Sequence, residues 1–259
     1  MFDLHSNHKH QNVAVTLLIL LVLGSLIAMA AELPYGGWLQ IPLLSLVWWR
    51  LSSEVHLSRK KFFTLGMAFG LGYFVAGLWW LYISLHDVGG MNVLLSCMAV
   101  FLLSAYMALY FSIACLSICF FKSSYIIGLF LASSWVVSEY LRGEIFTGFP
   151  WMGFAEAQIN GPFAPIAPFF GGLACTFFVI WTSWEIVLIK KRWLTSTIGI
   201  VSVIAVSQLA GLFTFTKPFG EPVSVRLIQG NFEQSLKLNP LAISQQIDFY
   251  KKTIKKFGS

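Results

Sequence analysis

Residues Val13–Ala31 read VAVTLLILLVLGSLIAMAA, a run of nineteen residues without a charged side chain. A helix needs about 20 apolar residues to cross the roughly 30 Å hydrocarbon core of a membrane. The run therefore predicts a transmembrane helix. A cleaved signal peptide is the alternative, because Ala28-Met29-Ala30 resembles a small-residue cleavage site. The apolar run exceeds the about 7–15 residues usual in signal peptides, so we favour the transmembrane helix.

The rest of the chain repeats this pattern up to Thr216. Hydrophobic residues make up 57% of the chain and charged residues only 11%, against about 25% charged in soluble domains. This composition predicts a polytopic α-helical membrane protein with about seven transmembrane helices in a bundle over residues 1–216. The second span contains Pro42 and is expected to be tilted, broken or only partly inserted. The predicted spans are Val13–Ala31, Tyr35–Leu51, Phe62–Leu85, Val93–Phe121, Tyr125–Leu141, Phe163–Ile189 and Trp193–Thr216.

Basic residues are distributed unequally between the two sides of this predicted bundle. With a cytoplasmic N-terminus, the cytoplasmic segments carry nine Lys and Arg residues and the outer loops carry only Arg142. Because cytoplasmic loops are enriched in Lys and Arg, this split predicts that orientation and places the residues after Thr216 on the far side. The net charge of +6 then requires no nucleic-acid partner. The nine residues are Lys9, Arg50, Arg59, Lys60, Lys61, Lys122, Lys190, Lys191 and Arg192.

The pattern changes after Thr216. Val223–Asn231 (VSVRLIQGN) alternates apolar and polar side chains at its start, which is typical of a β-strand. Asn239–Phe257 carries an apolar stripe at helical spacing, and Asn239-Pro240 suits a helix start. One strand and one helix cannot enclose a core. We therefore expect residues 217–259 to be the opening of a soluble domain whose body is missing.

The loop after the fifth span is rich in chemically distinctive residues. Glu139–Phe154 reads EYLRGEIFTGFPWMGF. Glu139 and Arg142 are three residues apart, so they share a helix face and can pair. Ionisable groups at membrane depth are costly without a partner and often mark function. We select Glu139, Arg142, Phe149 and Trp151 as candidate lipid-binding residues; the alternative is that this loop only anchors the chain at the membrane surface.

A second distinctive stretch ends the third span. Trp80 and Tyr82 suit the aromatic belt at a membrane interface. His86 and Asp87 follow, before Gly89-Gly90, and form a polar turn able to touch a lipid headgroup.

The cysteines predict neither a disulfide framework nor a catalytic or metal site. All four lie in predicted spans, where a thiol is usually a small packing residue. Cys115 and Cys119 share a helix face, but no nearby His or carboxylate completes a metal site. The other two are Cys97 and Cys175.

Three motifs together resemble one family, the apolipoprotein N-acyltransferases of bacteria. The first is G-F-P-W at Gly148–Trp151, preceded by E-Y-L-R-G. The second is W-x-Y-x-S-x-H-D-x-G-G from Trp80 to Gly90, and the third is I-Q-G-N-x-x-Q-x-x-K from Ile228 to Lys237. The resemblance covers essentially the whole chain and implies a multi-pass protein of the inner membrane.

The resemblance also implies an activity. Members carry a periplasmic nitrilase-like (carbon–nitrogen hydrolase) domain, whose cysteine thiolate takes an acyl chain from a phospholipid, typically phosphatidylethanolamine. The acyl chain then passes to the N-terminal diacylglyceryl-cysteine of an apolipoprotein. A glutamate acts as general base and a lysine stabilises the oxyanion. The partners implied are a phospholipid donor and an apolipoprotein acceptor, with no metal or organic cofactor.

None of these three catalytic residues can be placed in this chain. In the family they follow the Q-G-N strand at a distance that lies past Ser259, and Leu238 stands where members commonly have Trp. We therefore expect the chain to be inactive alone. The alternative function is a non-catalytic membrane protein, either a decayed fragment or an accessory that binds lipid or a partner. A transporter is less well supported, because the sequence shows no internal repeat.

Overall fold

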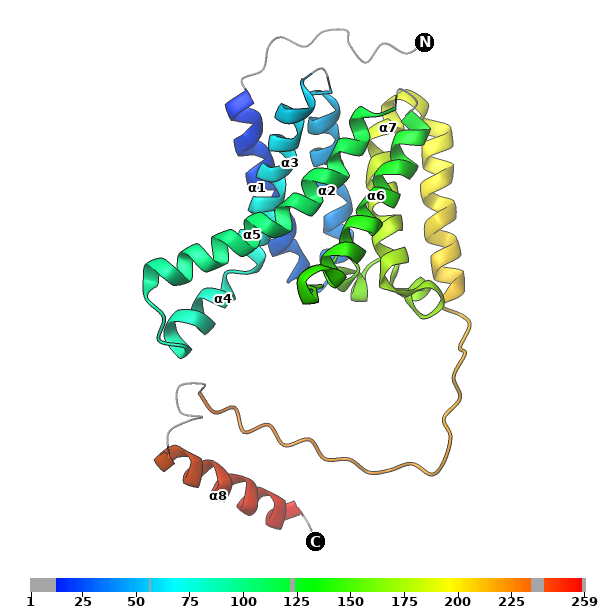
Figure 1. Ribbon diagram of the computed structural model, residues 1–259. Helices are drawn as coiled ribbons and strands as arrows, with labels where there is room; N and C mark the ends of the chain where they lie inside the picture. Colours follow the sequence, from blue (N-terminus) through cyan, green and yellow to red (C-terminus); the bar gives the residue numbers. More distant parts are fainter. Residues whose placement is uncertain (1–12, 56, 122–123, 234–239, 258–259) are drawn as a thin grey trace.

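The computed structural model describes residues 13–55, 57–121, 124–233 and 240–257, and within these ranges the regular structure is entirely helical. Helices α1, α2, α3, α6 and α7 stand side by side, and α5 crosses them at a tilt (Figure 1). The short α4 and the π-helical turn Ser84–Val88 lie beside the first half of α5, outside the main bundle (Figure 1). The helices are α1 Val13–Ala31, α2 Gly36–Ser52, α3 Arg59–Gly77, α4 Trp80–Ile83, α5 Val93–Cys115, α6 Ser124–Glu144, α7 Ala167–Ala210 and α8 Pro240–Phe257.

Helices α1 and α3 pack with their backbones in direct contact. A Cβ atom at Gly72 would collide with the carbonyl oxygen of Leu21, so the site accepts only glycine without a shift of the backbone. The Ser25 hydroxyl donates a hydrogen bond of 3.1 Å to the Gly72 carbonyl across the same contact. Small residues that let helices approach closely are the usual means of association within a membrane, where the hydrophobic effect is weak.

The apolar helices are compatible with the predicted helical membrane protein. Within the described ranges, α1, α5 extended to Cys119, and Ala164–Ala210 are each long and apolar enough to cross a membrane. A fourth candidate joins α3 to Trp80–Val88 across a bend of 50°, so the predicted third span is broken after Gly77. By contrast, α2 continues through Pro42 without a break. The number of seven spans stays a prediction.

Helix α7 is a hairpin. Its 44 residues would extend about 66 Å as one rod, roughly twice the thickness of the hydrocarbon core. The backbone leaves the helical conformation at Arg192, with φ −147° and ψ 56°. Beyond it, Ser196 donates a 2.8 Å hydrogen bond back to the Glu185 carboxylate, and Gln208 donates one of 3.0 Å to the Pro162 carbonyl. The two antiparallel halves correspond to the predicted sixth and seventh spans.

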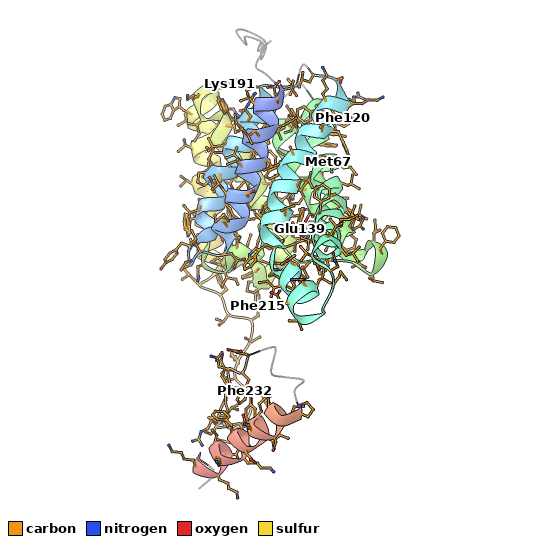
Figure 2. The ribbon with its side chains drawn as sticks, turned by 90° about the vertical axis from the view of Figure 1, so that its left-hand side faces the viewer. Met67, Phe120, Glu139, Lys191, Phe215 and Phe232 are labelled. Carbon is orange, nitrogen blue, oxygen red and sulfur yellow. The ribbon has the colours of Figure 1, made fainter. Side chains whose placement is uncertain are left out.

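The two ends of the bundle differ in charge. The end of α2, the start of α3 and the reversal in α7 all lie at the end where α1 begins (Figure 1). These segments carry seven of the nine basic residues assigned to the cytoplasm; Lys9 and Lys122 lie outside the described residues. Lys191 and Phe215 mark opposite ends of the bundle in Figure 2. The path of the chain thus agrees with the predicted separation of basic loops, while the orientation in the membrane stays a prediction.

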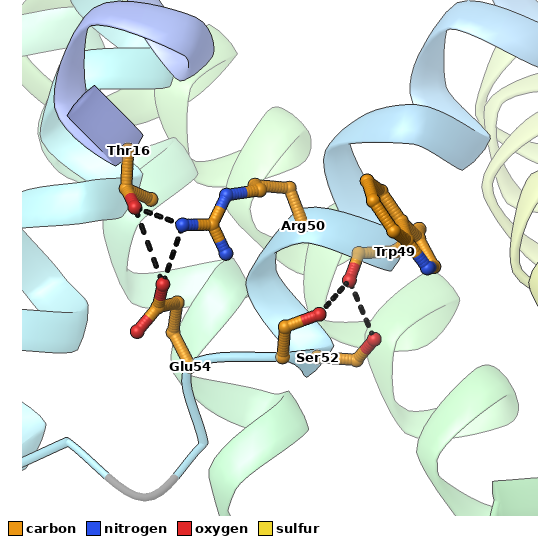
Figure 3. Close-up of polar contacts among 6 residues, drawn as sticks. Thr16, Trp49, Arg50, Ser52 and Glu54 are labelled. Carbon is orange, nitrogen blue, oxygen red and sulfur yellow. Dashed lines mark hydrogen bonds and ion pairs between the residues drawn. The ribbon is translucent and has the colours of Figure 1, made fainter. Parts of the chain in front are cut away.

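A buried ion pair ties α1 to α2 at the basic end. Arg50 and Glu54 approach to 2.6 Å, and their side chains are only 6% and 5% exposed (Figure 3). The hydroxyl of Thr16 accepts a hydrogen bond from Arg50 and donates one of 3.2 Å to Glu54. Each charge therefore has a partner although it is removed from water.

The predicted strand is not formed. Val223–Asn231 has no regular structure, and Asn231 has a positive φ of 48°. A strand is held by hydrogen bonds to a neighbour, and no neighbouring strand pairs with this segment in the described part of the chain. The predicted helix is present as α8; Asn239, its expected cap, lies outside the described residues. Three isoleucines of its apolar stripe are partly exposed, namely Ile243, Ile247 and Ile254. That residues 217–259 open a nitrilase-like domain stays a prediction.

Candidate functional site at the outer turn

Arg142 holds the turn that contains the G-F-P-W motif, residues Ile145–Met152, which we call the outer turn after its predicted side of the membrane. It lies in the last turn of α6 and is 1% exposed. The turn folds back so that the guanidinium donates to the carbonyl of Phe149 at 3.3 Å, to that of Pro150 at 3.5 Å and to that of Trp151. The guanidinium also lies 5.4 Å from the centre of the Phe74 ring. One side chain thus pairs with three successive carbonyls of the turn.

Glu139 and Arg142 interact through their charges but not by direct contact. Within the described residues the two groups are not within ion-pair distance, although they share a face of α6. Glu139, half-buried, instead accepts a 3.3 Å hydrogen bond from Thr176 of α7, and the main-chain N–H of Phe154 lies against it. The folded-back segment supplies carbonyls to the arginine and an N–H to the glutamate. Both charged residues therefore contact the main chain of the segment Phe149–Phe154.

The turn has an unusual backbone. Phe146, Thr147 and Met152 have positive φ values of 55°, 70° and 64°, which non-glycine residues rarely adopt. Gly148 also has a positive φ of 74°, and a Cβ there would collide with the carbonyl of Gly143. Such conformations persist only where the surroundings impose them, and they cluster at functional sites.

Two further side chains hold the end of the turn. The main-chain N–H of Met152 donates a 3.0 Å hydrogen bond to Glu156, and the Tyr73 hydroxyl donates one of 3.2 Å to the Met152 carbonyl. Tyr73, Glu156 and Thr176 were not among the candidates selected from the sequence. Their signals are weak, because a Tyr or Thr in an apolar helix is usually a packing residue.

The turn presents an aromatic edge. Trp151 is 51% exposed and lies 5.6 Å from Phe149, measured between ring centres. Trp80 of α4 stacks on Trp151 at 5.0 Å with an interplanar angle of 26°. The structure therefore brings Phe149 and Trp151 together above buried Arg142, and it adds Trp80 from the second motif.

His86 and Asp87 lie apart from this cluster, in the π-helical turn after α4. The Nδ1 atom of His86 is 2.7 Å from the Met91 carbonyl oxygen, and its ring packs 5.2 Å from that of Tyr82. The Asp87 side chain is 56% exposed. This turn is joined to the outer turn through Trp80.

Of the four cysteines, Cys115 and Cys119 lie close together at the end of α5. Cys115 and Cys175 are buried, whereas Cys97 is exposed on α5. In the described part of the chain, no three His, Cys, Asp or Glu side chains gather where they could hold a metal ion.

The sequence profile of the apolipoprotein N-acyltransferase N-terminal domain matches residues 23–184, which include both outer motifs and Arg142. The chain belongs to the apolipoprotein N-acyltransferase family. This confirms the resemblance inferred from the motifs.

Relatives in the family share about a third of the aligned residues. An apolipoprotein N-acyltransferase of Pasteurella multocida is 34% identical over 241 residues, covering 85% of this chain and 43% of the relative. One from Ralstonia nicotianae is 36% identical over 73% of this chain and 38% of the relative. One from Haemophilus ducreyi is 33% identical over 96% of this chain and 49% of the relative. The chain thus spans less than half the length of these curated relatives.

Proposed function

We propose that this chain forms the membrane portion of an enzyme that transfers an acyl chain from a phospholipid to the N-terminal diacylglyceryl-cysteine of an apolipoprotein. Membership of the apolipoprotein N-acyltransferase family supports the activity. The observation that carries the proposal for this chain is the aromatic turn, which Arg142 holds in place by three carbonyls. Such a turn is a rigid platform at membrane level, where a lipid has to be held for its ester to be reached.

The four candidate residues have two different roles in this proposal. Phe149 and Trp151 contact the phospholipid, because Trp151 is half exposed and Phe149 packs beside it. Glu139 and Arg142 are positioning residues that act through the main chain of the turn. The burial of Arg142 supports this division, since its guanidinium is committed to carbonyl oxygens.

The proposed location is the bacterial inner membrane. Seven spans with a cytoplasmic N-terminus would put the basic end in the cytoplasm and the outer turn on the periplasmic side. Residues 217–259 would then begin the periplasmic nitrilase-like domain. The apolipoprotein acceptor would be met on that side.

Replacing Trp151 with alanine is expected to weaken phospholipid binding about tenfold, equivalent to about 1.4 kcal/mol. The reason is the loss of a large aromatic surface at the proposed contact. Binding is measured by native mass spectrometry of the detergent-solubilised chain titrated with phosphatidylethanolamine. Trp193→Ala is the matched control, because Trp193 is 68% exposed and follows the reversal of α7 at the basic end. Equal losses in both variants would contradict a lipid site at the outer turn.

The purified chain alone is expected to transfer no acyl group. An acyl-transferring cysteine has to be an accessible thiolate, whereas Cys115 and Cys175 are buried, Cys119 is partly buried and Cys97 lies on an apolar helix. The measurement is transfer of a labelled acyl chain from phosphatidylethanolamine to a synthetic diacylglyceryl peptide. The relative from Haemophilus ducreyi serves as positive control. Turnover by this chain that survives Cys97→Ser would show that another group in it carries out the chemistry.

A further inference from the structure

A groove separates the middle of α5 from the outer turn. It is lined by Leu103 and Tyr106 of α5 and by Ile145–Phe149, and its volume is about 410 Å³. That volume falls within the about 300–1,000 Å³ typical of sites for small molecules. Phe149 lies in its wall, so the groove is continuous with the turn assigned to phospholipid above.

The backbone keeps one wall of the groove in a strained form. Phe146 and Thr147 both have positive φ, and Phe146 is 83% exposed. The Phe146 ring meets the Tyr106 ring edge-on, at 6.1 Å between centres. A large apolar ring held outward at such a backbone cost is consistent with an apolar ligand that covers it.

The surroundings of the groove indicate which apolar molecule is most abundant beside it. The α5 surface beside it is a continuous row of exposed apolar side chains, the surface that a membrane helix turns toward lipid. The local concentration of acyl chains along that surface far exceeds that of any other apolar molecule. The row comprises Leu94, Leu95, Met98, Phe101, Leu102 and Leu109.

A pair of tyrosine hydroxyl groups lies at the groove, and Tyr106 of this pair is one of its lining residues. The oxygens of Tyr106 and Tyr110 are 2.6 Å apart, so one hydroxyl donates to the other. Two tyrosines own two hydroxyl hydrogens, and the pair uses only one of them. Either hydroxyl can be the donor of the pair, and with Tyr110 as donor the hydrogen of Tyr106 is available to an acceptor in the groove. The carbonyl oxygen of an ester is such an acceptor.

From these observations we propose that this groove binds an ester-linked acyl chain of a phospholipid, with the chain between Leu103 and Phe146 and the ester near the tyrosine pair. The proposal rests on the proposed function, which places the rest of the lipid at Phe149 and Trp151. It adds the position of the acyl chain and makes Leu103 a residue that determines which chains fit.

Photocrosslinking of the full chain tests the proposal. The probe is phosphatidylethanolamine with a diazirine in one acyl chain, incorporated into nanodiscs, and the labelled peptides are identified by mass spectrometry. We expect labelling of the segment Ile145–Phe149 to fall about tenfold in Leu103→Trp, which fills the groove. Leu102→Trp is the matched control, because Leu102 is 60% exposed on the adjacent lipid-facing side, and it should label like the wild type.

A second comparison tests the ester. The wild-type chain should label about fivefold more with the ester-linked probe than with an ether-linked analogue, and Tyr106→Phe together with Tyr110→Phe should abolish that preference. Equal labelling of wild type by both probes would overturn the role of the hydroxyl pair.

The outcomes separate this inference from the proposed function. If labelling reaches Trp151 but Leu103→Trp has no effect on it or on Ile145–Phe149, the acyl-chain groove is wrong and the lipid site at the turn stands. Absence of specific labelling at both places would overturn both. Uniform labelling along α5, unchanged in every variant, would show only bulk lipid and would also overturn the groove.

Discussion

Replacing Arg142 with methionine is expected to lower the apparent melting temperature of the detergent-solubilised chain by roughly 10 °C. The variant keeps much of the side-chain volume but leaves the carbonyls of Phe149, Pro150 and Trp151 without their donor. Hydrogen bonds to a charged group contribute about 1.5–3 kcal/mol each, so a total loss of at least about 3 kcal/mol follows. Thermal unfolding followed by size-exclusion chromatography measures the change.

Two further variants separate a specific role of Arg142 from a general loss of stability. Arg59→Met removes an arginine that is exposed and also lies against an aromatic ring, 5.0 Å from the centre of Phe120, and it should change the melting temperature little. Arg142→Lys keeps the charge but cannot bridge three carbonyls, because an ammonium lacks the planar fork of the guanidinium. It should lose phosphatidylethanolamine binding even at temperatures where it remains folded. Normal binding by folded Arg142→Lys would contradict a positioning role for Arg142.

The helices themselves could be predicted well because their signal is local. The bounds of α1 were predicted as Val13–Ala31 and are the same in the structure. The reversal within α7 was also anticipated, since Lys190, Lys191 and Arg192 interrupt an apolar run with charge. In each case the information lies in consecutive side chains.

The break after α3 could not be predicted from local sequence. The stretch from Gly77 to Leu85 contains no proline or charge, and its apolar and aromatic residues suit a continuous span. In the structure, Met152 occupies the space beside Gly77, and Trp151 stacks on Trp80. These partners lie about seventy residues away in the chain, so the bend of 50° depends on tertiary contacts.

The sequence could predict which residues form the candidate site but not which groups they contact. Spacing placed Glu139 and Arg142 on one helix face, and the structure agrees. The two charges attract each other, but the hydrogen-bond partners of Arg142 are main-chain carbonyls. Carbonyls occur at every residue and leave no mark in the sequence. Only the turn at Phe146–Gly148, with its positive φ values, brings the carbonyls of Phe149, Pro150 and Trp151 within reach of Arg142.

Replacing Glu54 with alanine is expected to destabilise the basic end of the bundle as strongly as the loss of Arg142 destabilises the outer turn. The change leaves the Arg50 charge buried without its carboxylate partner, 2.6 Å away in the native chain. Removing one member of a buried ion pair typically costs about 3–5 kcal/mol. We expect a fall in apparent melting temperature of roughly 10 °C or more in the same thermal assay.

The pair also predicts which double variant recovers stability. Arg50→Met combined with Glu54→Leu removes both charges, so no uncompensated charge remains, and replacement of a buried pair by apolar residues is often neutral. The double variant should therefore melt above Glu54→Ala, although it carries more substitutions. Thr16→Val removes only hydroxyl hydrogen bonds to the pair and should cost about 1 kcal/mol. If the double variant melts below Glu54→Ala, or Thr16→Val matches that variant, the cluster does not hold α1 against α2 by charge compensation. A geometric role of the three side chains would then be the better account.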